Sequence, residues 1–273
     1  MKKYIKRYFK FLIILFWNIR KKPFSYGYGL ARQEKIISIL KKNKSKRIHI
    51  RNCYGFDERL VEYKLIFDEL EKMNNKLILD AGSTLNFKYL LDKIIKKNKI
   101  FIETLFPENE NFNTDGISYI YNDLTNSKFK DNCFDVITCI SVLEHVGFDN
   151  SSYIFNNNNF SSIPKKNKSI YLTSIKQFKR ILKINGKLLI TIPFGKKMMF
   201  NHLQQFNNND IKNIISTFKP KKYSLRFFKY HNGIWSEVQE KECLDSQIRV
   251  DQTSKTSDNL ASARSICFIK LIK

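Results

Sequence analysis

The spacing of hydrophobic residues along the chain changes near residue 76. Before that point, apolar residues recur at helical spacing in residues 31–42 and 57–73, which predicts two helices. After it, short apolar runs alternate with helical segments, and each run predicts a buried strand. The predicted strands are residues 77–79, 100–102, 117–121, 134–140 and 187–192, followed by two late strands at residues 223–230 and 265–272.

Helical segments separate these strands. Helices are predicted at residues 87–95, 171–182 and 210–218, and Asn185-Gly186 is expected to end the second of them. Strands that alternate with helices form a mostly parallel sheet whose two faces are both covered by helices. The pattern therefore predicts an α/β fold for the larger part of the chain.

The first 22 residues place a short apolar run between basic residues. The run Phe11–Trp17 is shorter than the ~20 residues that cross a bilayer, and Arg20–Lys22 follow it without a cleavage site of small residues. Two interpretations stay open: an interfacial helix on an anionic membrane with Trp17 at the headgroup level, or a helix packed on the domain or on a partner subunit. Residues 1–56 are predicted to be a basic helical extension, with residues 41–51 as a linker.

The chain is strongly basic. It contains 49 Lys and Arg against 25 Asp and Glu, a net charge of +24, which attracts polyanions and anionic surfaces. Lys far outnumbers Arg, and Lys, Asn, Ile, Phe and Tyr are abundant together, a composition that an AT-rich genome also produces. We therefore expect no dedicated nucleic-acid partner. The five cysteines are scattered without a CxxC pair, which predicts neither a metal site nor a disulfide framework and favours a reducing cytoplasm.

Polar residues follow four of the predicted strands, in chain order. In an open parallel sheet, ligands bind beyond the carboxyl ends of the strands. A glycine there lets a ligand approach the backbone, an acid after the next strand can bind ribose hydroxyls, and a further Asp can accept from an adenine amino group. The four ends read Asp80-Ala81-Gly82-Ser83, Glu103-Thr104, Asn122-Asp123-Leu124 and Ser141-Val142-Leu143-Glu144-His145.

These segments resemble the successive motifs of class I S-adenosylmethionine-dependent methyltransferases of the type 11 kind. The motifs are LILDAGSTLN (77–86), NDL (122–124), DNCFDVITCISVLEH (131–145) and FKRILKINGKLLITIP (178–193). The likeness extends over residues 76–196 and, more faintly, over residues 204–218.

The resemblance implies a fold and a cofactor. It predicts a Rossmann-like fold for residues 57–273, with a seven-stranded, mostly parallel sheet, helices on both faces and an Asn-rich insertion at about 150–169. The implied cofactor is S-adenosylmethionine. The implied cofactor-binding set is Asp80, Gly82 and Ser83 at the methionine end, Glu103 at the ribose with Thr104 or Glu108 as alternatives, Asp123 and Leu124 at the adenine, Ser141 at the floor, and Glu62 or Tyr63 near the methionine carboxylate or amine.

The turn after the first of these strands departs from the family pattern. Typical members have three alternating glycines after the acid, whereas Thr84 and Asn86 stand at the second and third places here. Asn tolerates a left-handed backbone, but a β-branched Thr does so less readily. A non-catalytic relative, either a cofactor-binding or a membrane-anchored interaction protein, is therefore an alternative interpretation.

His145, at the end of the fourth strand, is the candidate catalytic residue. Methyl transfer from a sulfonium is an in-line displacement that requires alignment of the reacting groups, and a hydroxyl or amine acceptor benefits from a general base within reach. An imidazole titrates near neutral pH, which suits that role. The alternative is that His145 caps a helix or bonds the backbone.

Four segments show a narrower likeness, to methyltransferases of bacterial surface-polysaccharide gene clusters. They are DERLVEYKLI (57–66), LEHVGFDN (143–150), TIPFG (191–195) and ASARSI (261–266). The likeness implies a hydroxyl or amine of a sugar or small molecule as the acceptor. The low-complexity stretch between Asn150 and Ser169 is predicted to be either a flexible insertion or a lid, with residues 151–163 closing over the acceptor. An RNA or protein methyltransferase is the alternative that the charge supports. We expect a cytoplasmic protein, peripheral on the inner face of the membrane if residues 1–22 are interfacial, and the sequence predicts no oligomeric state.

Overall fold

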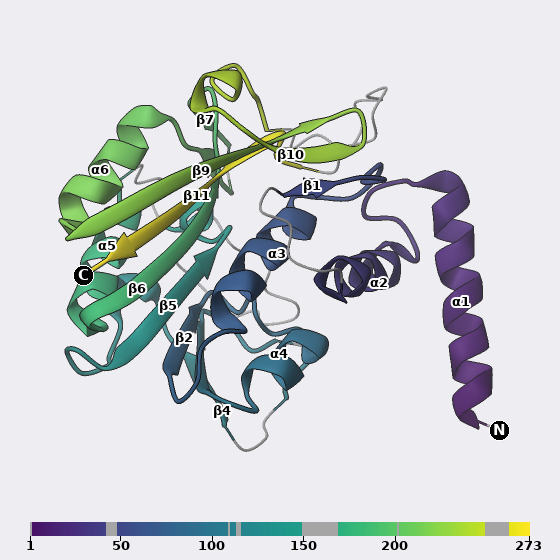
Figure 1. Ribbon diagram of the computed structural model, residues 1–273, viewed down its shortest axis with the longest axis horizontal. Coiled ribbons are helices and arrows are strands. Elements are labelled where there is room, and N and C mark those ends of the chain that lie inside the picture. The colour runs from purple at the N-terminus through teal and green to yellow at the C-terminus, as the bar shows by residue number, and fades with distance from the viewer. Residues whose placement is uncertain are drawn as a thin grey trace.

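The computed structural model describes residues 2–41, 48–108, 110–112, 116–148, 169–200, 202–248 and 262–273. A sheet of nine strands in the order β1-β10-β9-β11-β6-β5-β2-β3-β4 forms the centre of the molecule (Figure 1). Its strands are β1 (His49–Ile50), β2 (Leu77–Ala81), β3 (Lys99–Thr104), β4 (Ile117–Tyr121), β5 (Phe134–Ile140), β6 (Leu182–Pro193), β9 (Lys222–His231), β10 (Ile234–Val238) and β11 (Ser265–Ile272). A separate hairpin pairs β7 (Met198–Met199) with β8 (Gln204–Gln205).

Six α-helices accompany the sheet in the described part of the chain. They are α1 (Lys2–Arg20), α2 (Tyr28–Lys41), α3 (Arg59–Leu70), α4 (Lys88–Ile94), α5 (Tyr171–Ile181) and α6 (Asn208–Phe218). Two short 3-10 turns follow strands at the ligand-binding edge: η1 (Leu124–Asn126) after β4 and η2 (Leu143–His145) after β5.

The strand directions confirm the predicted Rossmann-like architecture. β4, β3, β2, β5 and β6 pair in parallel, and β11 runs antiparallel between β6 and β9. The registers Ala81↔Glu103 and Asp80↔Thr138 bring the carboxyl ends of β2, β3 and β5 side by side. The expected ligand edge is therefore formed by strands that are far apart in the sequence.

The sheet has nine strands rather than the predicted seven. After β9 the chain reverses at Asn232-Gly233, both with positive φ, and returns as β10. An Asn-Gly pair between two strands is a strong signature of a hairpin, and this signature was overlooked. Residues 49–50 lie in the segment predicted as a linker, but they form β1 and pair with Trp235 and Ser236 of β10.

The helix predicted to end at Asn185-Gly186 ends earlier, at Ile181, and β6 begins at Leu182. Asn185 has a positive φ of 62° and lies near the start of that long strand. The Asn-Gly pair therefore belongs to an irregularity of the strand instead of the helix end.

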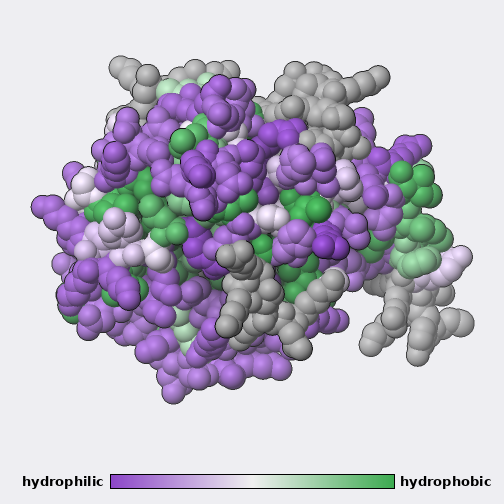
Figure 2. Space-filling model, turned by 45° about the horizontal axis from the view of Figure 1, so that its top comes forward, coloured by the Kyte–Doolittle hydropathy of each residue, from purple (hydrophilic) through white to green (hydrophobic). Residues whose placement is uncertain are grey.

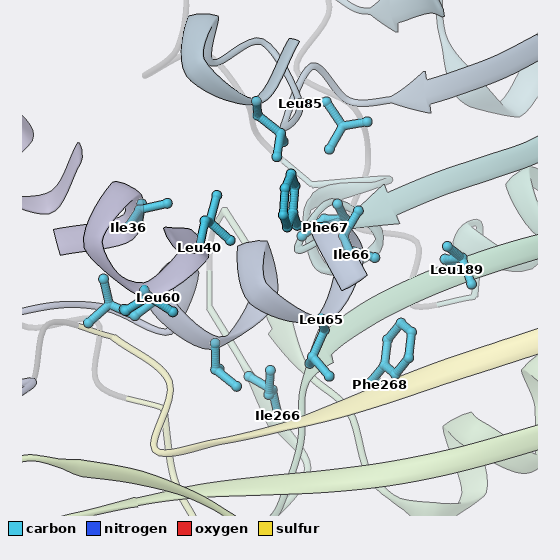
Figure 3. Close-up of a cluster of buried hydrophobic side chains, with 14 of the residues drawn as sticks. Ile36, Leu40, Leu60, Leu65, Ile66, Phe67, Leu85, Leu189, Ile266 and Phe268 are labelled. Carbon is cyan, nitrogen blue, oxygen red and sulfur yellow. The ribbon is translucent and has the colours of Figure 1, made fainter. Parts of the chain in front are cut away.

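Helices cover both faces of the sheet, as predicted. One core cluster joins α2, α3 and α4 to alternate residues of the strands, and a second joins α5 and α6 to the residues between them. Ile78 and Ile100 face the first cluster, whereas Leu79 and Ile137 face the second. Figure 3 shows side chains of α3 between those of α2 on one side and Leu189 of β6 and Phe268 of β11 on the other. α3 thus lies directly on the sheet, with its first turn at the ligand edge.

The first helix, α1, packs on α2 through one face only (Figure 1). Trp17 is 1% exposed, its ring centroid lies 4.6 Å from that of Phe56, and its Nε1 donates to the carbonyl of Lys22 at 2.8 Å. The interpretation that placed Trp17 at the headgroup level is therefore wrong, because the indole fills a space between α1, α2 and the segment before α3. No helix of the described residues is long and apolar enough to cross a membrane.

The opposite face of α1 is apolar and exposed. Figure 2 shows apolar residues gathered on this helix, at the right of the molecule. At helical spacing the exposed side chains form one continuous stripe without a charged residue: Tyr8, Phe9, Phe11, Leu12, Leu15, Phe16 and Ile19. The division of the chain at residues 56 and 57 remains a prediction.

Candidate functional site

The carboxylate of Asp80 shapes the turn after β2. The residue is fully buried; its Oδ2 accepts from the Leu85 N–H at 2.6 Å and its Oδ1 from the Thr138 hydroxyl at 3.1 Å. Burial raises the pKa of Asp80 to about 7 in spite of these bonds. Both oxygens thus accept hydrogen bonds within the protein and hold the turn in place.

Gly82 and Ser83 form the left-handed part of that turn. Gly82 has a φ of +104°, and a Cβ at this position would lie 2.3 Å from Val142 Cγ2, so only glycine fits between β2 and the residue that follows Ser141. Ser83 has a φ of +63°. Its hydroxyl is buried and finds no hydrogen-bond partner among the described residues. A buried donor without a partner at this edge is a group that a ligand can satisfy.

Thr84 and Asn86 do not conflict with the turn. The left-handed residues are Gly82 and Ser83, so the expected strain at Thr84 is absent. Thr84 Oγ1 donates to the carbonyl of Ile140 at 2.9 Å, and its own carbonyl accepts from the Tyr63 hydroxyl at 2.6 Å. Asn86 Oδ1 accepts from the Tyr119 hydroxyl at 2.8 Å. These hydrogen bonds tie the turn to β5, α3 and β4.

Glu62 joins α3 to the ends of β5 and β6. It is fully buried, and its Oε1 accepts from the hydroxyls of Ser141 at 2.5 Å and Thr191 at 2.7 Å. Its Oε2 accepts from Arg59 Nη1 at 3.1 Å. Ser141 has a φ of +46°, which this hydroxyl bond helps to hold. The predicted residues Glu62 and Ser141 therefore lie together, with their polar atoms hydrogen-bonded to each other.

Arg59 is a site residue that the sequence analysis missed. Its Nη1 also donates to the carbonyl of Ile140, the last residue of β5, at 2.9 Å. The guanidinium thus lies at the carboxyl edge, and 24% of the side chain is exposed. Arg59 precedes Glu62 by three positions, so both lie on one helical face; this spacing was the available signal.

The ends of β3 and β4 carry the other predicted cofactor residues. Glu103 is buried, accepts from Asn122 Nδ2 at 2.9 Å and Ser127 Oγ at 3.2 Å, and burial raises its pKa. Asp123 is exposed, and its Oδ1 accepts from the Thr125 N–H at 2.8 Å. Leu124 lies in the core below it.

The two alternatives to Glu103 differ in exposure. Thr104 is 9% exposed, and its carbonyl accepts from the Asn122 N–H at 2.9 Å. Glu108 is exposed; besides burial, its charge contributes to the raised pKa of Asp80. Its carboxylate is therefore close to the turn and open to solvent.

Glu144 and His145 follow β5 in η2. The Nδ1 of His145 lies 2.8 Å from the carbonyl oxygen of His202. A carbonyl only accepts, so this nitrogen carries the hydrogen and Nε2 of the neutral ring is an acceptor. Burial lowers the pKa of His145 to about 4. Glu144 is 4% exposed, and its Oε2 has no hydrogen-bond partner among the described residues. Burial, and then the charge of Glu62, raises the pKa of Glu144 to about 8.

Replacing Glu144 by glutamine is expected to flatten the fall of stability as the pH rises from 6.5 to 8. The folded pKa values of Glu144 and Asp80, about 8 and about 7, exceed those of the unfolded chain, so their contribution is complete at low pH and is lost as pH rises through these values. His145 acts oppositely, but only between about pH 4 and its unfolded value near 6.5. Urea unfolding at pH 6.5 and 8 should therefore show a smaller loss for Glu144→Gln, by at most about 1.4 kcal/mol per pH unit.

The matched control is Glu110→Gln, which changes an exposed carboxylate. Its pH dependence should follow that of the wild type. An unchanged slope in Glu144→Gln would show that Glu144 is ionised in the folded protein at neutral pH.

Comparison with known proteins finds a partial family match and two distant relatives. The methyltransferase domain family Methyltransf_11 matches residues 96–157. The uncharacterized protein MJ0638 of Methanocaldococcus jannaschii is 27% identical over 165 residues, which are 58% of this chain and 62% of that protein. Protein Ycf2 of Marchantia polymorpha is 26% identical over 242 residues, which are 86% of this chain but 10% of Ycf2. The chain thus spans less than two thirds of the length of either relative.

A solved structure shares the fold. The S-adenosylmethionine-dependent methyltransferase from Archaeoglobus fulgidus superposes with a TM-score of 0.50 at 13% identity, over 81% of this chain and 96% of that protein. The family match covers part of the predicted motifs, and the solved structure shares the fold that they predicted.

Proposed function

We propose that the protein transfers a methyl group from S-adenosylmethionine, bound across the carboxyl ends of β2, β3, β4 and β5, to a sugar or sugar-linked acceptor. The observation that carries this proposal is the turn at Gly82 and Ser83. Two consecutive left-handed residues bring the backbone against Val142 and leave a buried Ser83 hydroxyl without a partner among the described residues. That arrangement fits a polar ligand lying over the turn.

The neighbouring residues fit the parts of this cofactor. Ser83 and the backbone of Gly82 would hold the methionine portion, and the guanidinium of Arg59 would bind its carboxylate. Glu103 would bind the ribose hydroxyls in exchange for, or beside, its bonds to Asn122 and Ser127. The exposed carboxylate of Asp123 would accept from the adenine amino group, and the backbone of Leu124 would adjoin it, since its side chain lies in the core.

His145 is proposed to orient the acceptor. S-adenosylmethionine supplies an activated methyl group with a good leaving group, so alignment of the acceptor is the main task of the protein. A pKa of about 4 makes His145 a weak proton acceptor at neutral pH, but its Nε2 can accept a hydrogen bond from a hydroxyl. His145 therefore positions the acceptor oxygen in this proposal, and the proton leaves to solvent as the bond forms.

The acceptor class is inferred from the four segments with the narrower likeness. Their described parts lie near one another at the ligand edge. Glu58 Oε2 accepts from the Ala263 N–H at 3.1 Å, and the Ser265 hydroxyl donates to the Phe194 carbonyl at 2.6 Å. The basic surface suits a phosphate-bearing sugar. The proposed lid, residues 151–163 with Tyr153, Phe155 and Phe160, lies outside the described residues.

The test is transfer of labelled methyl groups to nucleotide sugars and lipid-linked glycans, with total RNA beside them. Label in sugars is expected, and label in RNA alone would favour an RNA methyltransferase. His145→Asn should lower the rate by about 10²-fold, because the acceptor is no longer aligned, while S-adenosylmethionine affinity by calorimetry stays unchanged. The control is His231→Asn, an exposed residue at the end of β9. Full turnover of His145→Asn would remove His145 from the reaction.

The exposed stripe of α1 is proposed to attach the protein to the cytoplasmic face of an anionic membrane. Aromatic and aliphatic residues on one helical face, beside basic residues and on a chain of net charge +24, suit the boundary between headgroups and acyl chains. Phe11→Ser/Leu15→Ser should abolish sedimentation with anionic vesicles at low salt, and Lys176→Gln/Lys212→Gln should not. Equal sedimentation of both variants would contradict the attachment.

A further inference from the structure

A cavity of about 600 Å³ lies between α1, α2 and the segment before α3, away from the proposed cofactor site. Its apolar wall includes Ile14 and Phe56, and its polar wall includes Asn18, Lys21, Lys35 and Asn52. The proposed methyl transfer uses none of these residues. The cavity is therefore a separate feature of the N-terminal part of the chain.

Close packing holds the walls of this cavity in place. The buried ring of Trp17 lies against Phe56, and its Nε1 bond to the Lys22 carbonyl fixes the end of α1. A Cβ on Gly55 would lie 2.3 Å from the carbonyl oxygen of Lys21, so the segment before α3 touches the end of α1. These contacts fix the end of α1 against the segment before α3, and the two form sides of the cavity.

The polar wall carries positive charge. Glu34 also lines the cavity, but its carboxylate is paired with Lys10 Nζ at 2.6 Å. The ammonium of Lys21 lies 5.6 Å from the centre of the Tyr54 ring, and Lys35 Nζ donates to the Arg51 carbonyl at 2.9 Å. The ammonium of Lys21 and the two asparagine amides supply hydrogen-bond donors, and Lys35 adds a second positive charge. This set of donors recognises an anion with several oxygen acceptors, such as a phosphate ester.

The position of the cavity relative to the exposed stripe identifies the source of that phosphate. Ile14 lies on the packed side of α1 and Lys21 follows its last residue, whereas Phe11, Leu15 and Ile19 lie on its exposed side. A helix with its side chains is about 10–12 Å across, so a cavity behind an interfacial helix lies at the level of the lipid headgroups. A second copy of the chain is a poor occupant for this surface, because each copy carries a net charge of +24 and repels the other.

We infer that this cavity binds the phosphate-bearing headgroup of an anionic membrane lipid. The inference rests on the proposed attachment of α1 and adds a headgroup site to it. Lys21 binds the phosphate, the charge of Lys35 beside it adds attraction, Asn18 and Asn52 bind its neighbouring oxygens, and the outward stripe lies among the acyl chains. The full-length protein is then held at one depth and in one orientation on the membrane.

Trp17 provides a direct measurement of occupancy. The chain has two tryptophans, and Trp235→Phe leaves only Trp17, which packs on the cavity wall at Phe56. Phosphatidylcholine vesicles that contain phosphatidylglycerol should change the Trp17 emission, and pure phosphatidylcholine vesicles should not. Lys21→Gln/Lys35→Gln should weaken vesicle binding about 30-fold, as expected for two charges near an anionic surface.

The control pair Lys176→Gln/Lys212→Gln removes the same charge from exposed positions on α5 and α6, and should retain nearly full binding. Equal binding of the two pairs would overturn the headgroup site. Glycerol 3-phosphate or inorganic phosphate binding as tightly as the vesicles would overturn the lipid assignment in favour of a soluble phosphate. If Phe11→Ser/Leu15→Ser no longer sediments with vesicles while the two double lysine variants bind them equally, the attachment through α1 stands and the headgroup site is removed. Binding of S-adenosylmethionine by every variant shows that each is folded.

Discussion

Asp80→Ala is expected to abolish measurable binding of S-adenosylmethionine and to lower the free energy of unfolding by about 3 kcal/mol. The substitution leaves the buried Leu85 N–H without an acceptor and removes the bond from Thr138. Each buried polar group that loses its partner costs about 1–3 kcal/mol. The turn would lose the contact that fixes Gly82 and Ser83, so its ligand-facing backbone would no longer be preorganised. Calorimetric titration and urea unfolding measure the two effects.

Asp80→Asn separates the charge from the hydrogen bonds. An asparagine oxygen can still accept from Leu85, and its amide can donate to the Thr138 hydroxyl. Because burial raises the pKa of Asp80 to about 7, the neutral side chain is already well populated near neutral pH. We therefore expect Asp80→Asn to retain most of the affinity and stability. Asp92→Ala on α4 is the matched surface control, and wild-type affinity in Asp80→Ala would contradict the role of the turn.

Glu62→Ala is expected to destabilise the protein by about 3–5 kcal/mol, the usual cost of removing one partner from a buried ion pair. The carboxylate is fully buried and joins Arg59, Ser141 and Thr191. Its loss leaves the Arg59 charge without this partner and frees Ser141 from the bond that supports its left-handed backbone. Urea unfolding measures the loss, and S-adenosylmethionine affinity should fall with it.

Two further variants identify the origin of that loss. Glu69→Ala, in the same helix, removes a half-buried partner of Lys270 and should cost less than about 1 kcal/mol. In Arg59→Met/Glu62→Met both members of the ion pair are replaced by apolar groups, so part of the stability should return. If the double variant were no more stable than Glu62→Ala, the hydroxyl bonds of Ser141 and Thr191 would account for the whole effect.

Local pattern alone determined the order of strands and helices and the residues at the strand ends. Buried parallel strands are continuous apolar runs bounded by turns, so residues 77–79, 100–102, 117–121 and 134–140 were each visible within a short window. In the same way, the sequence placed Asp80, Glu103, Asp123 and Ser141 at one edge of the sheet, since parallel strands end on the same side.

Only the tertiary structure decided what these side chains contact, because their partners lie far away in the sequence. The oxygens of Glu62 and Asp80 bind groups 79 and 58 positions away, so neither carboxylate points freely at a ligand. The residue after Gly82 that adopts a left-handed backbone is Ser83. The Thr84 side chain is bonded to the end of β5. Trp17 is buried against Phe56, and β1 forms by pairing with β10; both partners lie far away in the sequence. A local pattern shows that a residue is apolar or charged, but burial and pairing depend on the neighbours that folding brings to it.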